Sequence, residues 1–292
     1  MGSSLFSRTT EVEAVRPGLY AANLAPEWNC PVVPQGGIST AVAARAMGAE
    51  LAHEEQALRS ITAVFAAPVA AGPVEIDVTV LRAGRSISQC TATMRNPGAP
   101  AGLTAVAVFG AERRGFEFTD NAPPPDLPTP DQCRSFRDPI PDEFDWEPDE
   151  EPFSFWQHIE GKGVIGHPPW EDYTPDEALI ARYSRFDDPP RDDSGAWDPL
   201  AVLALCDTMP GAVGEKLGPE RGQPRWMPPS ADFTVHMFGT ARSEWVLFVN
   251  RARHAGDGYA SCDIEAWDME GAAPRLVAYA TQMMIFTFPK DA

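Results

Sequence analysis

The chain has 292 residues, of which 43% are hydrophobic, so it can bury one large core or two ordinary ones. A formal net charge of -19 argues against a nucleic-acid partner, because such proteins present a basic face to the phosphates. No apolar run approaches the about 18 residues of a membrane span, and no basic-then-apolar leader opens the sequence, so a cytoplasmic protein without membrane contact is expected. The five cysteines are scattered without a CxxC pair. They predict buried free thiols, and neither a metal nor a cofactor is expected.

The first half alternates turn residues with short apolar runs. Two strands are predicted at residues 6–15 and 18–24, separated by the turn signal Pro17-Gly18. A Gly36-Gly37 pair then precedes an Ala-rich run over residues 38–47, which predicts a helix. Four further strands are predicted at residues 60–65, 74–81, 86–94 and 103–109. The expected result is one long helix lying on an antiparallel meander.

The Gly36-Gly37 pair is a candidate ligand contact. Glycine lets the backbone approach a ligand closely, and the free N–H groups of a helix start face a carbonyl oxygen or an anion. An ordinary loop is the alternative interpretation of such a pair.

Residues 119–151 are rich in proline and acidic side chains and cannot build a core. We therefore expect a linker over the surface, between an N-terminal domain of residues 1–118 and a C-terminal domain of residues 152–292.

The second half repeats the plan of the first. Strands are predicted at residues 153–163, 178–186 and 230–238, with a helix over residues 198–217. Gly84 and Gly256 each end a strand, and Cys90 and Cys262 each follow six residues later, so that 256 − 84 and 262 − 90 both give 172. Two copies of this plan describe an α+β double hotdog, with two long helices each wrapped by an antiparallel sheet.

Asp207 is the candidate functional carboxylate. The predicted helix begins at Asp198 with Pro199 and is apolar on every side, so it is expected to be buried. Asp207 lies at i+7 from Leu200 and i+4 from Leu203, which points it into the interior. A buried carboxylate is unfavourable unless hydrogen-bond donors surround it or it stays protonated. The alternative is a frayed helix end, since Pro210 follows closely.

Further motifs occur in order along both halves. They are Trp28, residues 65–68, Val80-Leu81-Arg82-Ala83-Gly84-Arg85-Ser86, Leu205-Cys206-Asp207-Thr208-Met209-Pro210, Ser230-Ala231-Asp232-Phe233-Thr234, Glu244-Trp245 and Ala280-Thr281-Gln282. With these motifs in this order, nearly the whole chain resembles the type II acyl-CoA thioesterases, which are double-hotdog proteins. The resemblance implies hydrolysis of acyl-CoA to a free acid and CoA, in fatty acid metabolism.

The family's hydrolytic residues are an Asp on the second helix, a Thr or Ser at the start of the next strand and a Gln on the last strand. They match Asp207, Ser230 and Gln282 here. Such groups would hold and deprotonate a water, with Gly36 and Gly37 as oxyanion donors.

Three further features complete this interpretation. Arg85 follows a turn glycine and is a candidate for holding a pantetheine phosphate, although such an Arg is more often solvated. The chain differs from the commoner pattern at Phe233 and Gly239-Thr240. The first helix carries no carboxylate, and the position that matches Gln282 at a shift of 173 is Phe109, so one site per chain is predicted.

Two other function classes remain open. A hotdog enoyl-CoA hydratase would need a paired Asp and His, and no such pair occurs at the required spacing. A non-catalytic acyl- or polyketide-binding module would keep the fold without turnover, and a thiol-release assay separates it from a hydrolase. Exposed sheet edges favour a homodimer or a larger homo-oligomer.

Overall fold

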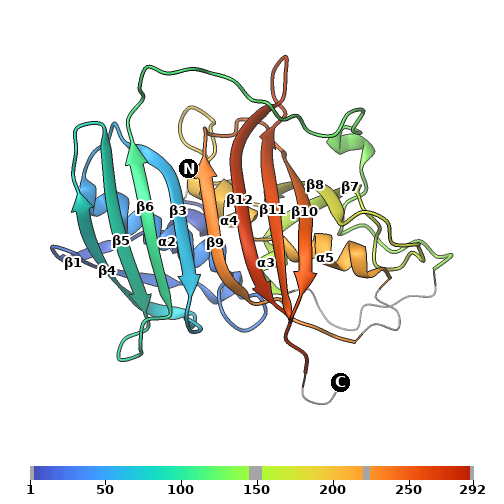
Figure 1. Ribbon diagram of the computed structural model, residues 1–292, viewed down its shortest axis with the longest axis horizontal. Helices are drawn as coiled ribbons and strands as arrows, with labels where there is room; N and C mark the ends of the chain where they lie inside the picture. The colour runs from blue at the N-terminus through green and yellow to red at the C-terminus, as the bar shows by residue number, and fades with distance from the viewer. Residues whose placement is uncertain (1–2, 145–152, 220–223, 290–292) are drawn as a thin grey trace.

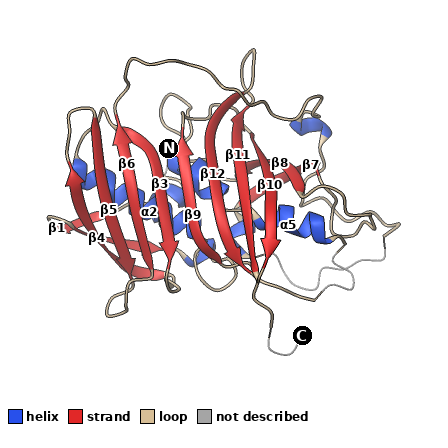
Figure 2. Ribbon diagram, in the orientation of Figure 1, coloured by secondary structure: helices blue, strands red, loops and turns tan. Residues whose placement is uncertain are grey.

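The strands of the protein join into one curved antiparallel sheet with the helices on its inner face (Figure 1, Figure 2). The structure is a computed structural model that describes residues 3–144, 153–219 and 224–289. Within the described residues the sheet has 12 strands, in the order β1-β2-β4-β5-β6-β3-β9-β12-β11-β10-β8-β7. No helix of the described part of the chain is both long and apolar enough to cross a bilayer.

The first half contains a long central helix and six strands. Its elements are α1 (Leu5–Thr9), β1 (Glu13–Arg16), β2 (Leu19–Leu24), η1 (Pro26–Trp28), α2 (Gly36–Leu51), β3 (Ala57–Phe65), β4 (Gly72–Arg82), β5 (Ile87–Arg95) and β6 (Leu103–Gly110). The small side chains of α2 let the helix lie close to the sheet, where ten of its residues are buried. Alternation places Val74, Ile76 and Val78 of β4 on the buried face, as the sequence predicts.

The second half repeats this order with a divided helix. Its elements are η2 (Pro130–Gln132), α3 (Ser154–Gln157), β7 (Ile159–Ile165), β8 (Leu179–Phe186), α4 (Pro199–Cys206), α5 (Pro210–Leu217), β9 (Ser230–Met237), β10 (Val246–Gly256), β11 (Tyr259–Asp268) and β12 (Arg275–Ile285). The antiparallel sheet and internal duplication agree with the prediction. The expected second long helix is instead two helices of eight residues each, α4 and α5.

The two halves meet at β3 and β9, which pair antiparallel through Thr62 and Thr234. Their hydroxyl oxygens lie 3.0 Å apart. The separation of these two residues, 234 − 62 = 172, equals the repeat offset that the cysteines and glycines predict. Helix α2 also packs on α4, and one cluster of buried hydrophobic side chains extends through both halves.

Two predicted strands begin differently. Residues 5–9 form helix α1 because Ser4 caps it, accepting a hydrogen bond from the Ser7 N–H at 3.0 Å, and β1 starts only at Glu13. In the second half, the short helix α3 likewise precedes β7. In both places a helical turn replaces the start of the predicted strand.

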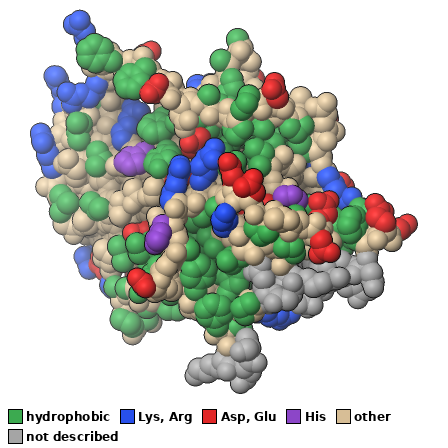
Figure 3. All heavy atoms as spheres, turned by 45° about the vertical axis from the view of Figure 1, so that its right-hand side comes forward, with side chains coloured by type: hydrophobic (Ala, Val, Ile, Leu, Met, Phe, Trp, Pro, Cys, Tyr) green, Lys and Arg blue, Asp and Glu red, His purple; other side chains and the backbone are tan. Residues whose placement is uncertain are grey.

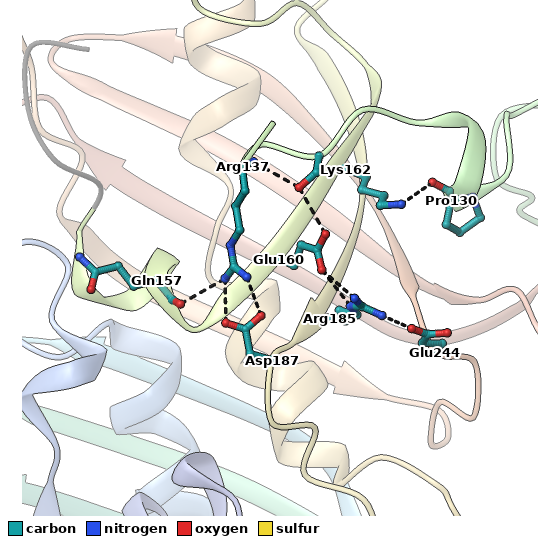
Figure 4. Close-up of polar contacts among 9 residues, drawn as sticks. Pro130, Arg137, Gln157, Glu160, Lys162, Arg185, Asp187 and Glu244 are labelled. Carbon is teal, nitrogen blue, oxygen red and sulfur yellow. Dashed lines mark hydrogen bonds and ion pairs between the residues drawn. The ribbon is translucent and has the colours of Figure 1, made fainter. Parts of the chain in front are cut away.

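The predicted linker runs along the surface of the second half as far as the structure describes it; its residues 145–151 lie outside the described part of the chain. Figure 4 shows Arg137 bound to the Asp187 carboxylate, with both nitrogen–oxygen distances 2.8 Å, and to the Gln157 carbonyl. Lys162 of β7 donates to the Pro130 carbonyl at 2.8 Å. The linker also contacts the backbone of the edge strand β7, since the Phe136 N–H donates to the Gly161 carbonyl at 2.9 Å, and this leaves fewer edge groups free to pair with another chain.

Candidate active site

Asp207 lies where the second helix is interrupted. Helix α4 ends at Cys206, and the Asp207 backbone leaves the helical region with φ −82° and ψ 51°. Pro210 explains the interruption, because its ring carries no N–H and excludes the carbonyl that a continuous helix would place beside it. The Asp207 side chain stays buried, with 7% of the residue exposed. It is therefore held inside the protein and is not a frayed helix end.

Groups from three separate elements donate hydrogen bonds to the Asp207 carboxylate. The Gly37 N–H of α2 donates to Oδ2 at 2.8 Å. Gln282 Nε2 of β12 donates to Oδ1 at 2.9 Å, and the Ser230 hydroxyl of β9 donates to the same oxygen at 3.3 Å. Gln282 Nε2 also donates to the Ser230 hydroxyl. The structure thus brings together the three side chains to which the family resemblance points, Asp207, Ser230 and Gln282.

The environment of Asp207 raises the pKa of its carboxyl group toward neutral pH. Burial raises the pKa of this carboxyl from 3.8 to about 7, and the hydrogen bonds from Gly37 and Ser230 oppose that rise. A carboxylate with this pKa accepts a proton readily near pH 7 and returns it readily.

Gly36 and Gly37 are required by the close approach of the second helix. A Cβ atom on Gly36 would lie 2.7 Å from Asp207 Oδ2, and one on Gly37 would lie 2.6 Å from the Ala204 carbonyl oxygen. The Gly37 N–H, predicted as an oxyanion donor, instead binds Asp207. Gly36 lines the pocket described below, at the helix start where N–H groups have no intrahelical acceptor.

Gln35 is a site residue that the sequence reasoning missed. Its side-chain amide nitrogen donates to the Asp207 carbonyl oxygen at 2.6 Å and to the Ala204 carbonyl oxygen at 3.1 Å. Its amide oxygen accepts the Ile38 N–H at 3.0 Å, which caps α2. One side chain therefore joins the start of α2 to the end of α4. The available signal was a glutamine directly before a predicted helix start.

A cavity of about 680 Å³ opens beside Asp207, within the size range of small-molecule sites. Its lining is mainly apolar and includes Val32, Phe65 and Trp156, together with the polar side chain of Arg182. Figure 3 shows hydrophobic side chains gathered on the lower part of one face of the molecule. The cavity thus combines an apolar surface with a few polar groups around one carboxylate.

The structure does not bring Arg85 to this cavity. The cavity includes Phe65 and Leu103, which pair where β3 ends and β6 begins. Arg85 lies in the β4–β5 turn beside Ser86 and Ile87, and Ile87 pairs with Gly110 at the other end of β6. About seven residues of strand, or roughly 23 Å, separate the two ends. A glycine-Arg turn signal is local and does not report which end of the sheet the turn occupies.

Cys30, which also lines the cavity, stays a thiol. Burial, and to a lesser extent the nearby Asp207 charge, raise the pKa of the Cys30 thiol to about 12. The thiolate that covalent catalysis requires is therefore scarce at neutral pH. Chemistry at this cavity is better supplied by Asp207.

Models of known protein families match most of the chain. Residues 24–110 match the acyl-CoA thioesterase N-terminal domain, and residues 130–286 match the acyl-CoA thioesterase C-terminal domain. No curated protein matches the sequence.

Solved structures with the same fold cover almost the whole chain. A hot dog fold protein of unknown function from Alicyclobacillus acidocaldarius is 25% identical over 99% of this chain and 100% of its own, with a TM-score of 0.78. A putative thioesterase II from Thermobifida fusca is 23% identical over 98% and 99%, with a TM-score of 0.77. An acyl-CoA thioesterase II from Mycobacterium marinum is 17% identical over 98% and 100%, with a TM-score of 0.72.

Proposed function

Because the chain belongs to the acyl-CoA thioesterase family and hydrolyses acyl-CoA thioesters, we propose that Asp207 is its general base, with Ser230 and Gln282 orienting the attacking water. The hydrogen-bonded meeting of these three side chains beside the cavity carries the proposal. Gln282 adds a second observation: its amide oxygen is buried without a hydrogen-bond partner. A catalytic role is one explanation of an unsatisfied buried acceptor of this kind.

The reaction follows from these positions. Asp207 removes a proton from the water while the water oxygen attacks the thioester carbonyl carbon. This attack gives a tetrahedral intermediate. The carbon–sulfur bond then breaks, and Asp207 returns the proton to the departing CoA sulfur. The free acid and CoA leave, and the carboxylate is restored. A pKa near 7 suits a group that must both accept and return a proton.

The negative charge that develops on the thioester oxygen needs a donor. We assign this role to the Gly36 N–H, since Gly36 lines the cavity at the start of α2 and the Gly37 N–H is bonded to Asp207. Gly37 thereby positions the base, while Gly36 faces the substrate.

Asp207→Asn tests the assignment of the base. The variant should lower kcat about 100-fold or more, since that is the usual contribution of a positioned general base. Thiol release from acyl-CoA measures it. Asp232→Asn is the matched control, because Asp232 lies on the same strand as Ser230 but accepts the Met283 N–H at the exposed surface. Undiminished thiol release by Asp207→Asn would remove the assignment, and acyl-CoA binding without thiol release by the unaltered protein would favour a binding module.

A single site per chain is also proposed. The strand pairing places Gln282 opposite Phe233, and the equivalent pair in the first half is Ala107 opposite Ile61. Ala107, and not the predicted Phe109, is thus the counterpart of Gln282; both are apolar. The first half therefore has no equivalent amide, and a non-hydrolysable acyl-CoA analogue should bind once per chain in titration calorimetry.

The remaining expectations concern cellular context and assembly. We propose a cytoplasmic homo-oligomer in fatty acid metabolism, with domains of residues 1–118 and 152–292 joined by residues 119–151. Exposed apolar side chains on the outer sheet face support the assembly, namely Val64, Val106 and Met283. Light scattering that gave only the monomer mass would contradict it.

A further inference from the structure

Arg182 is a buried cation in the wall of the cavity. It lies on β8, only 9% of the residue is exposed, and it lines the cavity together with Asp207 and Thr208. The mechanism above does not use it. A buried arginine is costly to the fold unless an anion or a full set of acceptors surrounds its guanidinium.

The contacts of Arg182 leave that requirement unmet. One guanidinium nitrogen donates to the Thr208 hydroxyl, and the guanidinium carbon lies 5.0 Å from the centre of the Trp156 ring. Its Nε is buried without a hydrogen-bond partner. Among the ion pairs of the described residues, none involves Arg182.

Arg185, three residues along the same strand, provides the contrast. It binds the Glu160 carboxylate at 2.8 Å and also the Glu244 carboxylate, as Figure 4 shows. The more exposed arginine therefore has two carboxylates, whereas the buried one in the cavity has none within the described chain.

Arg182 remains charged at neutral pH. Burial lowers the pKa of its guanidinium to about 10, which still leaves it protonated at pH 7. The cavity wall therefore contains a positive charge whose Nε–H has no acceptor, in a lining that is otherwise mainly apolar. A carboxylate is the natural partner, because its two oxygens match the forked donors of a guanidinium.

We propose, on the basis of the hydrolase site assigned above, that the preferred substrate is a carboxyacyl-CoA whose terminal carboxylate pairs with Arg182. Thr208, the hydrogen-bond partner of Arg182, directly follows Asp207 in the chain. The cation and the general base line the same cavity, so a dicarboxylic acyl chain can reach from one to the other. Arg182 is in this view a specificity-determining residue that contacts the substrate and takes no part in proton transfer.

The unaltered protein provides the first test. Thiol release is measured for malonyl-, succinyl-, glutaryl- and adipoyl-CoA and for neutral analogues in which an isopropyl group replaces the carboxylate, after subtraction of the enzyme-free rate. For at least one chain length, kcat/KM should favour the carboxyacyl substrate about tenfold or more, as a site built for a polar group rejects its apolar analogue. A preference for the neutral analogue at every length would overturn the inference, as would a preference for 3-hydroxybutyryl- or acetoacetyl-CoA.

Substitutions provide the second test. Arg182→Met keeps a long side chain against Trp156 and should lower kcat/KM for the carboxyacyl substrate about 100-fold. Its rates with the neutral analogues should stay within about threefold, which a merely structural role would not predict. Arg182→Lys keeps the charge and should recover part of the selectivity. Arg185→Met removes the same charge from the same strand outside the cavity and should leave the selectivity unchanged.

The outcomes separate this inference from the proposed function. An equal loss with all substrates in Arg182→Met would show a structural role and overturn the specificity proposal. If Arg182→Met does not fold, the selectivity of the unaltered protein still decides. Hydrolysis that depends on Asp207 but shows no carboxylate preference would refute the role of Arg182 alone, whereas hydrolysis that is independent of Asp207 would refute the proposed base.

Discussion

Asp207 is subject to two opposing effects. Removal from water disfavours its charged form, while three donated hydrogen bonds favour it. Desolvation is the larger effect, so the pKa rises to about 7 without the carboxyl becoming permanently neutral. The catalytic usefulness of this residue therefore comes from incomplete compensation of its burial.

The pH dependence of hydrolysis should follow the ionisation of this one group. Because a general base acts when deprotonated, kcat/KM should rise about tenfold per pH unit below 7 and level off above it. Ser230→Ala removes a hydrogen bond that favours the charged form, so it should move the midpoint to higher pH. A pH–rate profile of thiol release checks both, and a profile that is flat from pH 5 to 8 would contradict the assignment.

The free energy of unfolding should depend on the same ionisation, but it should fall where the hydrolysis rate rises. The folded-state pKa is raised from 3.8 to about 7, so the contribution of Asp207 to stability is full below about pH 3.8 and is lost as pH rises through 7. Asp207→Asn avoids this loss and should be more stable than the unaltered protein at pH 8, by up to about 4 kcal/mol. Urea unfolding should show the difference shrinking toward pH 4, and a less stable variant at pH 8 would argue against a strained carboxylate.

At the scale of elements, the site is made by the end of one helix meeting the start of another. Pro210 divides the second helix at Asp207, and the glycines of α2 let its first turn approach that break. Gln35 then satisfies the carbonyls that the break leaves open. The same irregularity that frees the carboxylate is thus stabilised by the neighbouring half.

A pair of substitutions on one helix tests this close approach. Gly37→Ala would place a Cβ 2.6 Å from the Ala204 carbonyl oxygen and should lower both the melting temperature and the hydrolysis rate. Gly48→Ala meets only Phe109 at 3.7 Å, an ordinary contact, and should stabilise α2 by about 0.5–1 kcal/mol without changing the rate. Thermal unfolding and thiol release compare the two, and equal effects would contradict the packing argument.

At the scale of the whole molecule, the two halves form one structural unit. The sheet continues from β3 into β9, and buried side chains from both halves form one cluster. The site itself takes its base from the second half and two positioning contacts, Gln35 and Gly37, from the first. Neither half contains the complete arrangement.

Unfolding should accordingly be a single cooperative transition. In calorimetry, the van't Hoff and calorimetric enthalpies should agree. Met47→Ala, which leaves a cavity under the part of the sheet that the first half forms, should cost about 2–5 kcal/mol and lower the temperature of the entire transition. Two transitions, of which only one responds to Met47→Ala, would show independent halves.

Local sequence patterns sufficed for most of the strands, for the first long helix and for the duplication. Alternating apolar residues, turn signals and the Ala-rich run are properties of neighbouring residues, and they predicted β3–β6, α2 and a repeat offset of 172 that the Thr62–Thr234 pairing reproduces. They were weaker where a helical turn preceded a strand, as at α1, because a single capping side chain decides that choice. The apolar helix indicated Asp207, whereas Ser230 and Gln282 came from the family resemblance, and the three residues lie far apart in the chain.

Patterns along the chain were thus enough for the duplicated α+β fold and for a buried carboxylate, and the family resemblance added a hydroxyl and an amide. The three-dimensional structure was needed to show what these groups experience: how far burial raises the Asp207 pKa, that Gly37 holds the base, that Arg85 lies at the end of the sheet away from the cavity, and that Arg182 lines the cavity. The physical reason is that desolvation and donor geometry depend on groups that folding brings together from distant positions, whereas propensity and periodicity depend on neighbours along the chain.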